Sequence, residues 1–242
     1  MATFVLCHDA WEGGWAFNEV AQALISAGHK VYRPTLTGLG ERRHLGHRGV
    51  DLALHRQDVL QTLVYEDLQD VVLVGHGYGA IVATGVADDA PERIRLLVLL
   101  DPYLPQSGQS LLDLFRDTPI AEQLVGEARA YGEGWRLSPP LPPEDMRLGE
   151  QPLATLMQPL LLRHPPRVPR RVVECTARAP LPFYRPIADA IRTLAAEGVP
   201  VDQIACGHRA PAEAPKELAR LLLALVDPVA EQPPLDSAKK ED

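Results

Sequence analysis

The segment GHGYG, residues 75–79, follows an apolar strand-like run and precedes a helix-forming segment. A strand that turns sharply into a helix through G-x-S-x-G presents its serine as a nucleophile. Here the central position is Gly77, which has no side chain and cannot attack a substrate. Any chemistry at this turn must therefore come from residues elsewhere in the chain.

Five segments, in order along the chain, carry a resemblance to a known family. They read HDAWEGGWAF at 8–17, YRPTLTGLGER at 32–42, VVLVGHGYGAIVATGVAD at 71–88, PERIRLLVLLDPYLPQSGQS at 91–110 and GHRAP at 207–211. Together they resemble the α/β-hydrolase superfamily over roughly residues 3–226. Within it, the chain is most similar to small bacterial esterases related to plant hydroxynitrile lyases and salicylate-binding esterases, with glycine in place of the nucleophilic serine.

The resemblance implies a nucleophile at position 77, followed along the chain by an acid and then a histidine. His208 is the only histidine beyond residue 170, and it directly follows a strand-like segment. The loop after the strand-like segment 170–176 contains no carboxylate. Asp101, by contrast, ends the preceding strand-like segment, residues 94–101. Asp101 is therefore the candidate that orients His208. The competing interpretation is a turn aspartate before Pro102.

The resemblance also implies an oxyanion hole and a substrate pocket. The backbone N–H groups of Ala10 and Tyr78 would form the hole, which requires no particular side chain. Trp11 and Trp15 are expected to wall the pocket, although a tryptophan in a Gly-rich loop serves packing equally often. The remaining residues expected to contact the substrate are His8, Asp9, His76 and Arg209.

Three positions depart from the family pattern, and all belong to the expected site. Gly77 replaces the nucleophile, Asp9 stands where a glycine normally follows His8, and Arg209 stands where relatives often have an acidic residue. The opposite charges of Asp9 and Arg209 suggest a salt bridge or a polar contact with the substrate. The alternative is that both side chains point into solvent.

The residues that remain suit general-base catalysis. A His208–Asp101 dyad beside backbone donors can deprotonate a substrate or a water molecule without a covalent intermediate. We therefore expect an enzyme acting on a small or medium ester, lactone or carbonyl compound, by hydrolysis or by a lyase, cyclase or elimination reaction. Substitute nucleophiles are not expected, because Ser107 and Ser110 do not occupy a strand-to-helix turn and Cys7 lies within a strand.

Two alternatives stay open from the sequence. The chain could be a catalytically silent protein that keeps the pocket to bind a small molecule. It could also be a serine esterase or lactonase whose nucleophile was removed by mutation at position 77. The further changes at Asp9 and Arg209 favour a naturally rebuilt site over a single mutation.

The elements that must position these residues alternate between helix and strand. This pattern predicts an α/β class with a doubly wound, mostly parallel sheet of about six strands, in which ligands bind beyond the carboxyl ends of the strands. The alternation is lost between residues 102 and 170, which are expected to form a helical lid. The core is expected over 1–101 and 171–227, with a polar, Pro-rich, disordered tail at 228–242.

Composition excludes several classes of protein. A formal charge of -8 and a pI near 5.5 argue against binding to nucleic acid. No apolar run reaches the length of a membrane span, and the first residues do not resemble a signal peptide. Three widely spaced cysteines favour free thiols in the cytoplasm, and no cofactor or metal is expected. The expected partner is a small-molecule substrate, and a monomer and a homodimer are both compatible with the sequence.

Overall fold

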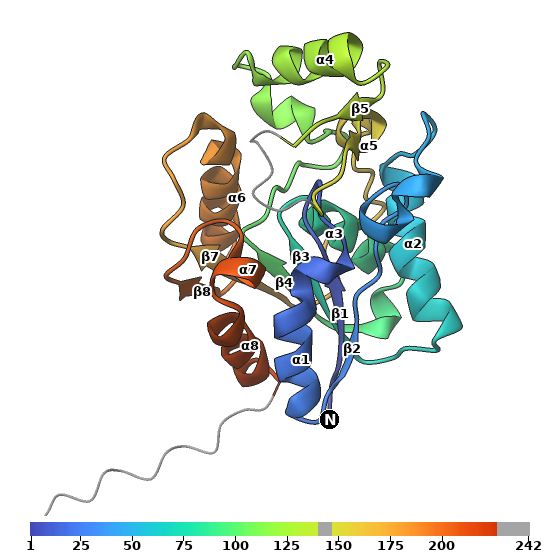
Figure 1. The fold of residues 1–242 in the computed structure, drawn as a ribbon. Coiled ribbons are helices and arrows are strands. Elements are labelled where there is room, and N and C mark those ends of the chain that lie inside the picture. The colour runs from blue at the N-terminus through green and yellow to red at the C-terminus, as the bar shows by residue number, and fades with distance from the viewer. Residues whose placement is uncertain (140–146, 227–242) are drawn as a thin grey trace, which may run out of the picture.

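The computed structural model describes residues 1–139 and 147–226. At its centre, six strands form one sheet in the order β2-β1-β3-β4-β7-β8, and every pairing is parallel (Figure 1). The strands are β1 (Thr3–Cys7), β2 (Lys30–Tyr32), β3 (Val71–His76), β4 (Ile94–Leu100), β7 (Arg170–Cys175) and β8 (Val201–Ile204). The predicted fold class is therefore confirmed. The predicted tail, residues 228–242, lies outside the described residues.

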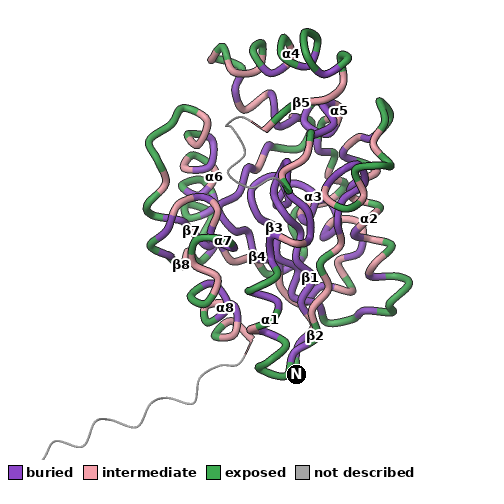
Figure 2. The backbone as a smooth tube through the Cα atoms, viewed as in Figure 1, coloured by how far each residue is buried: buried purple, intermediate pink, exposed green. Residues whose placement is uncertain are grey.

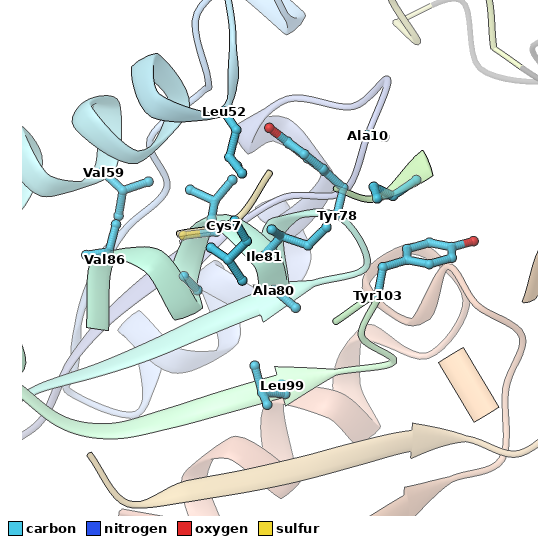
Figure 3. Close-up of a cluster of buried hydrophobic side chains, with 14 of the residues drawn as sticks. Cys7, Ala10, Leu52, Val59, Tyr78, Ala80, Ile81, Val86, Leu99 and Tyr103 are labelled. Carbon is cyan, nitrogen blue, oxygen red and sulfur yellow. The ribbon is translucent and has the colours of Figure 1, made fainter. Parts of the chain in front are cut away.

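Helices cover both faces of this sheet because successive strand side chains point to opposite sides. On β1, Val5 and Cys7 join one apolar cluster, whereas Phe4 and Leu6 join the other. The first face carries α2 (Leu52–Tyr65), α3 (Gly79–Asp89) and α6 (Arg185–Ala196), and the second carries α1 (Asn18–Ser26) and α8 (Pro215–Ala224). The central strands β1, β3 and β4 consequently lie largely buried between two helical layers (Figure 2). Figure 3 shows side chains of α2 and α3 meeting in the first cluster.

Two glycines allow α3 to start close against the end of β1. A Cβ at Gly79 would lie 2.5 Å from the carbonyl oxygens of Cys7 and His8, and a Cβ at Gly75 would lie 2.6 Å from Ala80 Cα. No larger residue fits at either position without moving backbone. This close approach brings the loop after β1 beside the turn between β3 and α3, which is where the expected site residues meet.

The lid lies above the carboxyl edge of the sheet (Figure 1). It contains α4 (Ile120–Tyr131) and α5 (Leu153–Met157), as predicted for a helical insertion, but also an antiparallel pair formed by β5 (Arg136–Leu137) and β6 (Gln151–Pro152). Trp11, in the loop after β1, makes three hydrogen bonds to the lid. Its backbone N–H donates to Gln151 Oε1 at 2.9 Å, its indole N–H donates to the Leu137 carbonyl at 3.1 Å, and its carbonyl accepts from the Gly149 N–H at 2.9 Å.

Two predictions about the whole chain can be compared with the described residues. Cys7, Cys175 and Cys206 are buried and free, as expected. Within residues 1–139 and 147–226, no helix is both long enough and apolar enough to cross a bilayer.

Candidate active site

The strand-to-helix turn keeps the backbone geometry that presents a nucleophile, but another side chain fills its centre. Gly77 has a φ of 53°, in the left-handed region, and its N–H donates to the Leu100 carbonyl at 3.1 Å. A Cβ at position 77 would lie 2.6 Å from Asp9 Oδ2 and closer still to Asp9 Oδ1. The carboxylate of Asp9 therefore occupies the space that a serine side chain would need.

This carboxylate makes the two contacts expected of a nucleophile and its oxyanion. Asp9 Oδ1 accepts a hydrogen bond from the backbone N–H of Tyr78 at 2.6 Å, the donor assigned from sequence to the oxyanion hole. Asp9 Oδ2 lies 2.9 Å from His208 Nε2. Only 9% of the surface of Asp9 is exposed, so both contacts are shielded from water.

Asp101 orients His208 from the other side of the imidazole ring. His208 Nδ1 lies 2.6 Å from Asp101 Oδ2, which is the pairing that the sequence predicts. Asp101 follows β4 with a φ of 44°, and its Oδ1 accepts from the Cys175 N–H at 3.1 Å and from the Arg178 guanidinium. Arg178, which the sequence analysis missed, compensates the charge of a fully buried carboxylate.

The ionisation states of His208 and Asp9 differ from those of a site whose histidine is neutral and free to act as a base. Burial alone would lower the pKa of His208, but the hydrogen bonds that its ring donates to Asp101 and Asp9 outweigh this effect and raise the pKa to about 9. Burial would raise the pKa of Asp9, but its interactions with His208 lower it to about 2. At neutral pH the site therefore holds an imidazolium between two carboxylates. In this resting state the Nε2 proton of His208 is directed at Asp9, so His208 must lose that proton before it can act as a general base, and its general-base role stays a prediction.

Asp9 and Arg209 do not form the salt bridge suggested from sequence, and the alternative of a polar contact with the substrate stays a prediction. Arg209 Nε instead donates to Glu12 Oε1 at 3.3 Å, and Asp9 is already engaged by His208. Burial and then the charge of Asp9 raise the pKa of Glu12 to about 7, although Arg209 opposes the rise. The sequence analysis missed Glu12, although it is a second carboxylate in the same Gly-rich loop, three residues after Asp9.

His8 and His76, both expected to contact the substrate, form hydrogen bonds to loop backbone instead. Buried His8 accepts from the Leu36 N–H at 3.1 Å through Nε2, and its Nδ1 donates to the Asp9 carbonyl at 2.8 Å. Buried His76 donates through Nε2 to the carbonyl of His208 at 2.7 Å. These contacts fix the backbone positions of Asp9 and His208, so both histidines act as positioning residues in this arrangement.

Asp9, His76 and His208 also bring three potential metal-ligand atoms within 4.8 Å of one another. Two buried atoms beside them, His76 Nδ1 and Glu12 Oε2, lie 4.0 Å apart and have no hydrogen-bond partner in the described part of the chain. Imidazole and carboxylate groups suit a divalent transition metal. A cation would have to displace the proton shared by His208 and Asp9, and the expected absence of a metal stays a prediction.

Aromatic side chains wall the region around His208. The ring of Tyr184 lies 4.9 Å from the His208 ring, and that of Tyr103 lies 6.0 Å from it. The ring centre of Phe183 lies 5.7 Å from that of Tyr103 and 6.4 Å from that of Trp11, so Trp11 belongs to this aromatic wall, while its expected contact with the substrate stays a prediction. Tyr103, Phe183 and Tyr184 were missed because they are scattered along the sequence and meet only in the fold.

Trp15 lies apart from this aromatic wall. A Cβ at Gly13 would lie 2.8 Å from Trp15 Cδ1, and the neighbouring Gly40 approaches the same ring. The guanidinium carbon of Arg147 lies 4.1 Å from the centre of the Trp15 ring. These contacts describe a packing role in the Gly-rich loop, which is the alternative that the sequence left open.

The other hydroxyl and thiol groups near the turn have separate roles. Burial raises the pKa of the Cys7 thiol to about 12, which keeps it protonated and unreactive. Ser110 Oγ donates to Asp113 at 2.8 Å, and Ser107 Oγ accepts from the Leu162 N–H at 3.0 Å. Among the candidate nucleophiles considered from the sequence, none occupies the centre of the site, whereas Asp9 does.

The overlap between Asp9 and position 77 predicts what a serine introduced at position 77 can do. Gly77→Ser alone should give no serine-dependent ester hydrolysis, because its side chain collides with the Asp9 carboxylate. The double change Asp9→Gly with Gly77→Ser should produce an acyl-enzyme burst on a chromogenic ester, since it frees Tyr78 N–H and His208 Nε2. Pre-steady-state kinetics on both variants check this. A burst from the single variant would show that Asp9 does not hold this space.

The ionisation of His208 can be measured directly. The pKa of its imidazole, ordinarily 6.5, should be about 9 in the folded protein and should fall in Asp9→Asn, whose amide N–H faces Nε2 and favours neutral imidazole. Because the folded pKa is raised, the resulting stabilisation is fully present below pH 6.5 and is lost as the pH rises through about 9. NMR titration of the histidines, with Asp189→Asn as an exposed control, measures the shift. An unchanged His208 pKa in Asp9→Asn would contradict the proposed ion pair.

Comparison with known proteins identifies the family to which the chain belongs. Residues 4–221 match the model of the family described as "Alpha/beta hydrolase family". The chain is 37% identical to a carbendazim hydrolyzing esterase of Nocardioides sp. (strain SG-4G), over 93% of this chain and 100% of that protein. It is 31% identical to an alpha-hydroxynitrile lyase of Arabidopsis thaliana, over 48% of this chain and 46% of that protein. A solved extracellular alpha/beta-hydrolase from a Paenibacillus species superposes with a TM-score of 0.77 at 22% identity, over 92% of this chain and 98% of that one. The chain therefore belongs to the α/β-hydrolase family, as an esterase-like enzyme related to hydroxynitrile lyases and methylesterases.

Proposed function

We propose that this enzyme hydrolyses a small or medium organic substrate with the carboxylate of Asp9 as its nucleophile, in place of the missing serine. One observation carries the proposal. The carboxylate fills the space of a side chain at Gly77 and contacts both Tyr78 N–H and His208 Nε2. Aspartate carboxylates are established covalent nucleophiles in other enzymes. The esterase relative of 37% identity supports a hydrolytic reaction on a compound of the ester, lactone or carbonyl type.

The ionisation states favour attack by Asp9 over direct attack by water. With its pKa lowered to about 2, Asp9 is fully ionised at neutral pH, and a weakly basic carboxylate still attacks an electrophilic carbon. Deprotonation of water by the resting site is unfavourable, because His208 is already protonated and Asp9 is a weak base. The sequence led us to expect general-base catalysis without a covalent intermediate. The reaction proposed here instead forms a covalent bond between Asp9 and the substrate.

The covalent step would convert His208 into the base that the second half of the reaction needs. Once Asp9 carries a substrate group it is neutral, and one of the two carboxylates that raise the pKa of His208 is lost. As the bond between the acyl carbon and the leaving oxygen of an ester breaks, His208 donates its Nε2 proton to that oxygen and the alcohol departs, while Asp101 keeps Nε2 directed at the site. Neutral His208 can accept a proton from a water molecule that attacks Asp9 Cγ. The N–H of Tyr78 would stabilise the negative charge that develops on Asp9 Oδ1.

The overlap at Gly77 also bears on the interpretation that a serine was removed by mutation. A serine esterase would need the space that Asp9 now fills, so an isolated change at position 77 does not account for the site. Glu12 and Arg209 form a further charged pair beside Asp9, which supports a naturally rebuilt site. A catalytically silent binding protein is the remaining alternative, and activity measurements separate it from the enzyme.

The role of Asp9 predicts a large loss of activity when its charge is removed. On a panel of activated esters, lactones and alkyl electrophiles, Asp9→Asn and His208→Ala should each lose about 10³-fold or more in kcat, because each removes a part of one catalytic unit. Steady-state rates are compared with Asp189→Asn, a matched change at an exposed aspartate, which should retain wild-type activity. Full activity in Asp9→Asn would reject Asp9 as the nucleophile. Tight binding of a panel compound without turnover would support the silent binding protein.

A further inference from the structure

We propose that Gln151, a buried residue of the lid, is a positioning residue that holds Asp9 against the N–H of Tyr78. The inference rests on the role proposed for Asp9 and adds to it a residue from outside the catalytic array. Gln151 begins the lid strand β6 and is fully buried, although glutamine is mostly exposed in proteins. A buried amide needs partners for its donor and its acceptor, so its hydrogen bonds show which segments it connects.

One end of the Gln151 amide holds the loop that carries Asp9. Its Oε1 accepts from the N–H of Trp11, two residues beyond Asp9, at 2.9 Å. Trp11 has a φ of 62°, a left-handed conformation that is costly for a residue with a bulky side chain. Such a conformation persists only where its surroundings fix it, and the acceptor on Gln151 is one of the contacts that do so. The direction in which the loop presents Asp9 therefore depends on the lid.

The other end of the amide leads to the turn that carries Tyr78. Gln151 Nε2 donates to Thr155 Oγ1 at 2.6 Å, and this hydroxyl donates to the Pro152 carbonyl at 2.6 Å. Thr155 also neighbours the hydroxyl of Tyr78, because burial raises the pKa of Tyr78 and the contact with Thr155 opposes that rise. Gln151 thus links the loop after β1 to the β3–α3 turn, the two segments whose meeting places Asp9 on the Tyr78 N–H.

The core fixes the Tyr78 side chain from the opposite direction. Its hydroxyl lies 2.9 Å from His55 Nδ1, and His55 Nε2 lies 2.8 Å from the Thr37 carbonyl. A carbonyl only accepts, so Nε2 carries the proton of this imidazole and Tyr78 donates to Nδ1. Burial lowers the pKa of His55 to about 4, so the ring is neutral at neutral pH and these directions hold. Tyr78 is therefore tied to α2, and a loosened Gln151 would move the loop of Asp9 relative to it.

A second glutamine of the lid provides a matched comparison. Gln158 follows α5, and its amide also bonds the core. Its Oε1 accepts from the Ala53 N–H at 2.7 Å, and its Nε2 donates to Asp51 Oδ2 at 3.1 Å. Both partners lie at the start of α2, outside the loop of Asp9 and the β3–α3 turn. A change that merely loosens the lid should act through either glutamine, whereas the positioning of Asp9 depends on Gln151.

Amide hydrogen exchange measured by NMR tests the proposal. Gln151→Met has nearly the shape of glutamine but forms neither hydrogen bond. The Tyr78 N–H should exchange about tenfold faster or more in this variant, because its acceptor on Asp9 is held less firmly. Gln158→Met should leave this rate at the wild-type value, and Asp9→Ala, which removes the acceptor, sets the upper limit of the effect. Thr155→Val, which breaks one leg of the connection and keeps the shape, replaces Gln151→Met if that variant does not fold.

Steady-state hydrolysis of phenyl acetate gives a second measure. Misplacing the nucleophile lowers kcat, so Gln151→Met should lose about tenfold or more in kcat, with KM within about twofold of wild type. Gln158→Met should keep both constants. Faster exchange at Tyr78 and a lower kcat in Gln151→Met, with neither in Gln158→Met, support the inference.

Two results would overturn it: wild-type exchange at Tyr78 in Gln151→Met, or equal effects of the two methionine variants. Exchange at Tyr78 does not require a covalent bond between Asp9 and the substrate, so it decides the matter even if phenyl acetate is not hydrolysed. Full activity in Asp9→Asn would reject Asp9 as the nucleophile, while the exchange rates would still show whether Gln151 positions its carboxylate. The two proposals therefore fail separately.

Discussion

The site depends on one buried array of charges, in which an imidazolium lies between two carboxylates. His208 bonds Asp101 through Nδ1 and Asp9 through Nε2, and all three groups are almost inaccessible to water. Burying an unpaired charge is costly, so each member depends on its neighbours. Arg178 compensates Asp101, and the N–H of Tyr78 satisfies the second oxygen of Asp9. Removing one member would change the ionisation of the others as well as their positions.

This array is possible because positions 9 and 77 share one volume. A side chain at position 77 and the carboxylate of Asp9 cannot occupy it together, and glycine at 77 leaves it to Asp9. The surrounding fold is otherwise that of its family, with the loop after β1 held against the β3–α3 turn by close glycine contacts. Under the proposed mechanism, Asp9 takes the role that the sequence pattern assigns to a serine at position 77, and Asp101, His208 and the N–H of Tyr78 complete the site.

Sequence patterns predicted the fold and much of the site, for identifiable physical reasons. Alternation of apolar strands with amphipathic helices predicts the parallel sheet, and the positions of Asp101 and His208 after two strands place them at one edge. The pairing of Asp9 with His208 was not predicted, because a sequence does not show that the space above Gly77 is refilled. Arg209 was wrongly paired with Asp9 because Glu12, the carboxylate that Arg209 actually contacts, was overlooked. The aromatic wall was missed since its residues converge only through the lid and the loop after β7.

The central claim is that Asp9 forms a covalent bond with the substrate, and isotope transfer measures this most directly. A single turnover is run in H₂¹⁸O with the enzyme in excess over a compound that it hydrolyses. If Asp9 is the nucleophile, water attacks its Cγ, so ¹⁸O appears in the Asp9 side chain and the oxygen gained by the product is unlabelled. If the product gains ¹⁸O directly and Asp9 stays unlabelled, water attacks the substrate itself and the proposed mechanism is contradicted.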